Sequence, residues 1–208
     1  MPIPYRGNDI LKAIAHTSCK GNMIYLTATP DEELLQRVKE GSLVCLKLNK
    51  RPHGKPIPVP KKIIGPKVFL FLQLLKWLKD CEDHPRIIFV PTIQKAMYLS
   101  QILSLLMDCY VCTSKSEDRD VVIRKFREEQ NGIMIATTVL ERGVTIPHCD
   151  VCVLEAQHDV FDEAGLVQMA GRAGRDFNDP YGDVLFLCNE KSKKVDDCIQ
   201  SILEANDS

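Results

Sequence analysis

The feature that most constrains the fold is a series of short apolar runs separated by helical patterns in the second two thirds of the chain. Five runs predict strands, and they lie at residues 87–90, 110–113, 133–137, 151–154 and 183–188. Apolar residues occupy successive positions in these runs, so both faces of the sheet should be covered. Strands that alternate with helices favour parallel pairing. The sequence therefore predicts an α/β fold with one parallel sheet and helices on both of its faces.

The first part of the chain carries a weaker version of the same pattern. Residues 23–26 and 43–48 are short apolar runs that we expect to be strands. Residues 31–40 predict a helix, because three acidic residues at its start suit the helix dipole and Gly41 follows its end.

A proline-rich segment divides these two parts. Residues 51–66 contain five prolines interleaved with basic residues, a composition that favours an extended connection. We therefore expect a first part at 1–50, a linker at 51–66 and a well-cored domain at 67–208. A chain of 208 residues suits one such domain with a smaller attachment.

Charge and cysteine usage narrow the class of protein. The net charge of −1 gives no global nucleic-acid signature, but residues 41–79 contain nine basic residues and no acidic one. This patch is either a solvated linker or a local contact for phosphates, and Arg51 and Lys55 lie in it. The nine cysteines, with no export signal and no apolar stretch of membrane-spanning length, indicate reduced thiols and a cytoplasmic protein.

The most informative stretch for chemistry is Gln168-Met-Ala-Gly-Arg172-Ala-Gly-Arg175. We expect its two arginines, three residues apart, to lie on one helical face, and its glycines allow a close approach of backbone or phosphate. Guanidinium groups suit the spread negative charge of a transferring phosphoryl group. The alternative is a surface helix end with solvated arginines.

Threonine hydroxyls follow several of the predicted strands. Thr92 follows one of them, Thr137 and Thr138 follow another, and Thr27 and Thr29 follow the run at 23–26. The carboxyl ends of parallel strands are where α/β sheets bind ligands, and hydroxyls there can hold a phosphate.

Taken in order, these stretches resemble the later motifs of superfamily 2 helicases. Residues 27–29 are similar to motif III, 87–92 to motif IV, 137–147 to motif V and 168–175 to motif VI. The sequences Ile-Tyr-Leu-Thr-Ala-Thr-Pro, His-Gly-Lys-Pro-Ile-Pro-Val-Pro and Leu-Glu-Arg-Gly-Val-Thr-Ile-Pro further resemble the ComFA family of competence DNA-uptake translocases. The resemblance covers nearly the whole chain and implies the C-terminal, RecA-like lobe of such a motor.

The resemblance also implies roles for single residues near ATP. Arg172 and Arg175 would reach the γ-phosphate as arginine fingers, and Gln168 would couple nucleotide to DNA. Gly143 and Thr145 would lie near the nucleotide, although Thr145 stands where many relatives carry an aspartate, which leaves its contact in question.

A second set of implied roles concerns DNA. Thr92, Thr137 and Thr138 would contact the phosphates of single-stranded DNA, and Arg51 and Lys55 would add charge. Thr27 and Thr29 would couple the two sites.

The loop that would hold ATP is missing from this sequence. No Gly-x-x-x-x-Gly-Lys-Ser/Thr stretch occurs, so ATP with Mg²⁺ would be bound mainly by an N-terminal RecA-like lobe, and this chain alone should not hydrolyse ATP. Implied partners are single-stranded DNA, that lobe, competence proteins at a membrane channel and further copies in an oligomer. A peripheral place at the inner face of the membrane is the other location that the resemblance admits.

Two other classes of protein compete with this interpretation. The first is a stand-alone nucleic-acid-binding or partner-binding module. The second is a zinc-binding regulatory protein, suggested by Cys109-x-x-Cys112 and Cys149-x-x-Cys152. Both pairs overlap predicted strands, where residues three apart point to opposite faces, so we expect buried thiols and no metal.

Overall fold

The structure is a computed structural model of the chain. It describes residues 9–26, 30, 32–46, 54–116, 118–129, 131–138, 146–176 and 181–207. The chain divides into two compact units, Met1–Leu48 and Asn49–Ser208, and each is treated by itself.

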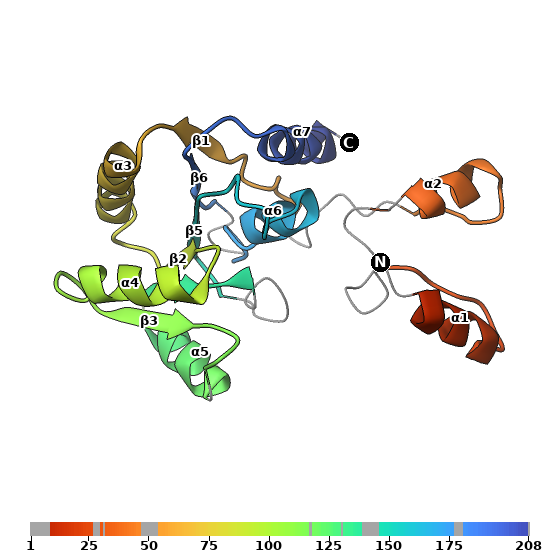
Figure 1. Cartoon of the computed structure of the whole chain (residues 1–208), viewed down its shortest axis with the longest axis horizontal. Helices are drawn as coiled ribbons and strands as arrows, with labels where there is room; N and C mark the ends of the chain where they lie inside the picture. The colour runs from red at the N-terminus through yellow and green to blue at the C-terminus, as the bar shows by residue number, and fades with distance from the viewer. Residues whose placement is uncertain are drawn as a thin grey trace. The chain divides into compact units, whose positions relative to one another are not determined.

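The second unit is built on one six-stranded, wholly parallel sheet (Figure 1). The strand order is β1-β6-β5-β2-β4-β3. The strands are β1 (Lys61–Ile64), β2 (Arg86–Phe89), β3 (Cys109–Cys112), β4 (Ile133–Ala136), β5 (Asp150–Leu154) and β6 (Val184–Cys188). All five predicted strands are present within one residue at either end, and the predicted α/β fold with a parallel sheet is confirmed.

Helices cover both faces of this sheet. Its helices are α3 (Lys67–Asp80), α4 (Ile93–Leu103), α5 (Arg119–Glu128), α6 (Glu163–Ala170) and α7 (Lys193–Asp207). One core cluster packs α3 and α4 against the sheet, and the other packs α5, α6 and α7. Within β2, Ile88 belongs to the first cluster while Ile87 and Phe89 belong to the second, which is the alternation that a pleated strand imposes. Trp77, 6% exposed, is part of the core.

The edge strand β1 lies inside the range predicted to be a linker. Its residues pair with β6 from Lys61 opposite Leu185 to Ile64 opposite Cys188. Proline is tolerated beside an edge strand. The proline-rich composition therefore led to the prediction of a linker where four residues form a strand. The docked segment begins even earlier, because Asn206 of α7 bonds both the amide and the carbonyl of Ile57, at 2.8 and 2.9 Å.

The described residues of the first unit form the helices α1 (Asp9–Ser18) and α2 (Glu32–Lys39). The helix predicted at 31–40 is confirmed, and Gly41 after it takes a positive φ of 74°. The helix α1 was not predicted. The strands predicted at 23–26 and 43–48 are wrong for the residues that are described there, which form no strand. The assignment of residues 1–50 to the tail of a first RecA-like lobe stays a prediction.

Over the part of the chain that the structure describes, no helix has the length and apolar character that a bilayer crossing requires.

Candidate functional site

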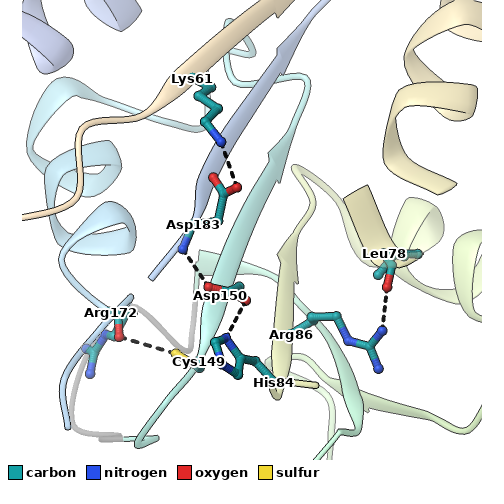
Figure 2. A network of polar contacts seen from close by, with 8 residues as sticks. All are labelled: Lys61, Leu78, His84, Arg86, Cys149, Asp150, Arg172 and Asp183. Atoms are coloured by element: carbon teal, nitrogen blue, oxygen red, sulfur yellow. Dashed lines mark hydrogen bonds and ion pairs between the residues drawn. The ribbon is translucent and has the colours of Figure 1, made fainter. Parts of the chain in front are cut away.

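The two motif arginines lie in a loop, residues 171–175, that directly follows α6; we call it the arginine loop. The spacing had predicted that both arginines lie on one helical face, and this prediction is wrong because the helix ends before them. The loop lies at the amino end of β5, because the Gly174 amide donates to the carbonyl of Cys149 at 3.3 Å. The Cys149 thiol donates in turn to the Arg172 carbonyl at 3.2 Å (Figure 2). Helix α6 follows β5 in the chain and runs back across the sheet. Its carboxyl end therefore lies at the amino edge of the sheet, beside the start of β5.

The two arginines differ in their surroundings. Arg172 is 7% exposed and counts among the buried charged residues. Arg175 is half-buried, and its Nε donates to the Gly171 carbonyl at 2.7 Å. Burial lowers the pKa of Arg175, and the nearby Cys149 opposes that shift. No carboxylate pairs with Arg175 among the residues that are described.

The other residues expected near the nucleotide are only partly described. Gln168 lies in the last turn of α6 and is half-buried. Gly143 and Thr145 lie outside the described residues. So do Thr27 and Thr29, expected to couple the sites.

Threonines gather at the opposite, carboxyl edge of the sheet. Thr92 follows β2, and its hydroxyl oxygen accepts from the Lys95 amide at 3.2 Å, which caps α4. Thr137 follows the neighbouring β4 and is 7% exposed, and Thr138 beside it is half-buried. Thr113 follows β3 and is 4% exposed. Sequence reasoning missed Thr113, although it is the last residue of a predicted strand.

The sheet separates the arginine loop from these threonines. A strand of four to five residues spans roughly 15 Å, and the two groups lie at its two ends. One small ligand therefore does not reach both groups, and the arrangement suits two ligands at two places. Lys55, expected to contact DNA, lies at the arginine edge, with its Nζ 5.9 Å from the ring centroid of Tyr181. Arg51 lies outside the described residues.

A polar network that the sequence did not reveal occupies the amino edge (Figure 2). The buried carboxylate of Asp150 accepts from the Asp183 amide at 2.5 Å and contacts His84 Nδ1 at 3.0 Å. Lys61 Nζ pairs with Asp183 at 2.8 Å. Burial raises the pKa of Asp150, while the hydrogen bonds from Asp183 and His84 oppose the rise. These groups line a cavity of about 520 Å³ together with Tyr181 and Gly182.

The cysteine pairs do not form a metal site within the described residues. No group of three or more histidine, cysteine or acidic side chains there is placed to hold a metal ion. Cys112, Cys149 and Cys152 are buried as predicted, and Cys109 is half-buried. Burial raises the pKa of Cys149 to about 12.

Comparison with known proteins decides the family. Residues 67–176 match the model of the helicase conserved C-terminal domain. The chain belongs to this family. The matched residues include β2 to β5, the threonine edge and the whole arginine loop.

Similar curated proteins extend the match to nearly the full chain. The competence protein ComFA of Streptococcus pneumoniae is 34% identical over 98% of this chain and 50% of the relative. The ComFA of Bacillus subtilis is 31% identical over 98% of this chain and 47% of the relative. The ATP-dependent DNA helicase RecG of a Synechocystis species is 26% identical over 83% of this chain and 22% of the relative. The resemblance to ComFA and to superfamily 2 helicases is thereby confirmed, and the chain spans about half the length of its ComFA relatives.

Solved structures of DEAD-box proteins share the fold. Dbp5 of S. cerevisiae, bound to RNA and ADP BeF3, superposes with a TM-score of 0.65 at 21% identity, over 95% of this chain and 52% of that chain. The C-terminal domain of Dbp5 gives a TM-score of 0.55 at 22% identity, over 72% of this chain and 85% of that chain. These matches support the RecA-like architecture alone.

Proposed function

We propose that this chain is the C-terminal motor lobe of an ATP-dependent single-stranded DNA translocase or helicase that acts in DNA uptake during competence. Two findings support the proposal: the similarity to ComFA over 98% of the chain and membership of the helicase C-terminal family. The observation that carries it is the arginine loop, in which the half-buried Arg175 has no carboxylate partner among the described residues.

Arg172 and Arg175 act in this proposal on a nucleotide that another lobe holds. ATP and Mg²⁺ bind there, because this sequence contains no Walker loop. The hydrogen bond from Arg175 Nε to Gly171 fixes the plane of the guanidinium and leaves the two terminal nitrogens for phosphate oxygens. Gln168 in the preceding turn, and Gly143 and Thr145, are proposed to lie near the same nucleotide.

The threonine edge is the proposed DNA contact. The Thr92 oxygen accepts from Lys95, so the hydroxyl proton stays available for a phosphate oxygen. Thr137 and Thr138 lie at the end of the adjacent strand. Glu155 at the same edge is paired with Lys95, which offsets its repulsion of a polyanion.

Further proposals concern partners and place. The N-terminal lobe, competence proteins at a membrane channel and further copies of the motor are proposed partners, in the cytoplasm or at the inner face of the membrane. Arg51, Lys55, Thr27 and Thr29 keep their proposed DNA-binding and coupling roles.

A stand-alone nucleic-acid-binding or partner-binding module is the second candidate. The missing Walker loop favours it, because the sequence cannot cradle a triphosphate by itself. Such a module would bind single-stranded DNA but would not restore ATP hydrolysis to any lobe.

The test fuses this chain to the remaining half of the Streptococcus pneumoniae ComFA and measures ATP hydrolysis stimulated by single-stranded DNA. Arg175→Ala and Arg172→Ala should each lower kcat by about 10³-fold. Arg124→Ala, which removes an exposed arginine from α5, is the matched control and should stay within about twofold of the parent. Equal loss in all three variants, or no loss with either motif arginine, would contradict the proposal.

A further inference from the structure

The segment 181–183, just before β6, lies directly against the arginine loop. A Cβ atom placed on Gly182 would come within 2.5 Å of the Gly174 amide nitrogen and 2.9 Å of the Ala173 Cβ. Real Cβ atoms do not approach that closely, and the first of these neighbours is backbone, which cannot rotate away as a side chain can. Any side chain at residue 182 must therefore displace the arginine loop or the strand β6.

The segment 181–183 is itself held firmly on its other side. The Asp150 carboxylate accepts from the Asp183 amide, and Lys61 pairs with the Asp183 side chain (Figure 2). His84 holds the second oxygen of Asp150. The segment 181–183, which contacts the arginine loop, is thus bonded to the first residues of β1 and β5, and through Asp150 to His84 before β2.

Cys149 supplies a second support for the loop. Its carbonyl accepts from Gly174 and its thiol donates to the Arg172 carbonyl. Gly174 has a positive φ of 59°, a conformation that glycine adopts without strain.

We propose that Gly182 and Cys149, with Asp150 behind them, are positioning residues that fix the direction of Arg172 and Arg175. This inference rests on the proposed function of the two arginines. None of the three residues is proposed to touch nucleotide. They hold the loop so that the guanidinium groups keep one orientation when the other lobe closes, and fixed geometry is what a phosphoryl-transfer site requires.

The test uses the full 208-residue chain, labelled with ¹⁵N, and follows the Arg175 Nε–H resonance and amide exchange by NMR. Gly182→Ala should shift or broaden the Nε–H signal and speed exchange of the Ala173 and Gly174 amides by about tenfold or more. The Ile135 amide in β4 should keep its wild-type rate.

Gly132→Ala is the matched control on the same edge of the sheet. Its Cβ would meet Glu129 Oε2 at 2.9 Å and the Phe126 ring at 3.2 Å, so it adds a close contact of its own away from the arginine loop. The Arg175 signal should not move in this variant. Wild-type loop signals in Gly182→Ala, or equal movement in Gly132→Ala, would overturn the inference.

A second pair of variants covers the case in which Gly182→Ala does not fold. Cys149→Ala removes the donor to the Arg172 carbonyl and should speed exchange of the Ala173 and Gly174 amides, while Cys149→Ser keeps a donor and should restore slow exchange. Identical exchange in both variants would contradict a positioning role.

ATP hydrolysis by the fusion with the remaining half of ComFA separates this inference from the proposed function. If Arg172→Ala and Arg175→Ala leave hydrolysis by the fusion unchanged, the proposed function loses its support, whereas the positioning role is still decided by the loop signals of the variants. If both arginine variants lose activity, Gly182→Ala in the same fusion should lower kcat by about threefold or more, because a mobile loop must be ordered before its guanidinium groups reach the phosphates.

Discussion

The two units of this chain differ most in what their apolar residues contact. In the second unit, two clusters of buried side chains fill both faces of the sheet. In the first unit, Leu34 is the single buried apolar residue among those described. Ile24, Leu26, Val44 and Leu46 are each more than 80% exposed there.

The difference shows what a strand needs in addition to its own sequence. Fully burying a Val, Leu or Ile side chain gains about 1.5 to 3 kcal/mol, so the four exposed residues forgo roughly 6 to 12 kcal/mol, which is comparable with the stability of a whole domain. The runs at 23–26 and 43–46 are suited to a sheet, and the described residues of the first unit form none. This supports the proposal that residues 1–50 belong with another lobe.

Amide hydrogen exchange should show the largest contrast between the units. The amides of Ile135 and Cys152 in the central strands should exchange about 10⁵-fold more slowly than those of Ile24 and Leu26, because the former open only with global unfolding. Exchange at residues 24 and 26 as slow as in the sheet, in a chain shown to be monomeric, would break the comparison.

Thiol reactivity should give the next largest contrast. Cys19 and Cys45 in the first unit are exposed, whereas Cys149 and Cys152 are buried, and burial raises the pKa of Cys149 to about 12. Alkylation at pH 8, followed by mass spectrometry, should modify the first pair at least about 10³-fold faster. Similar rates would mean that the second unit opens readily.

Arg86 tests how firmly the sheet of the second unit is held. Its Nη1 donates to the Leu78 carbonyl at the end of α3 at 2.6 Å, and its Nη2 donates to the Asn131 carbonyl before β4. Arg86→Ala should lower the free energy of unfolding by about 3 kcal/mol, because it leaves two carbonyls without a donor. Chemical denaturation, with Arg124→Ala as the control, would measure this, and a loss under 0.5 kcal/mol would contradict it.

Alkaline pH should lower the free energy of unfolding of the second unit, by a smaller amount per thiol and per pH unit than the Arg86 substitution. Burial raises the pKa of Cys149 and of Cys198 from 9.0 to about 12. Because these folded pKa values are raised, the stabilisation is complete below pH 9 and is lost as pH rises toward 12. Each thiol contributes up to about 1.4 kcal/mol per pH unit in that window.

Denaturation at pH 8.5 and 10.5 under reducing conditions measures this effect. Cys198→Ala should make the loss of stability with pH shallower. An unchanged pH dependence would show that the thiol is not the source.

The sequence predicted the second unit well because its strands are apolar on successive positions and helices separate them. It missed β1, whose proline-rich surroundings mask a short edge strand. It failed at 23–26, where the local pattern favours a strand but the described residues of the first unit offer no strand to pair with. Packing across the fold, such as Gly182 against Gly174, leaves no local pattern and was found only in the structure.

The same limit applies to the candidate site. Sequence reasoning singled out Arg172, Arg175 and the threonines from local motifs, and their roles stay predictions. It assigned Lys55 to DNA binding without a position, and the structure places the Lys55 ammonium group near the Tyr181 ring at the arginine edge. The buried Asp150 and its contacts could be inferred only from which strands start side by side.

The central claim is that this chain supplies charge to a triphosphate that it does not hold. The most direct test is ATP turnover by the purified chain alone, with Mg²⁺ and single-stranded DNA, against the Arg172→Ala, Arg175→Ala double variant. Both proteins should show the same background rate. Turnover by the wild-type chain that disappears in the double variant would contradict it.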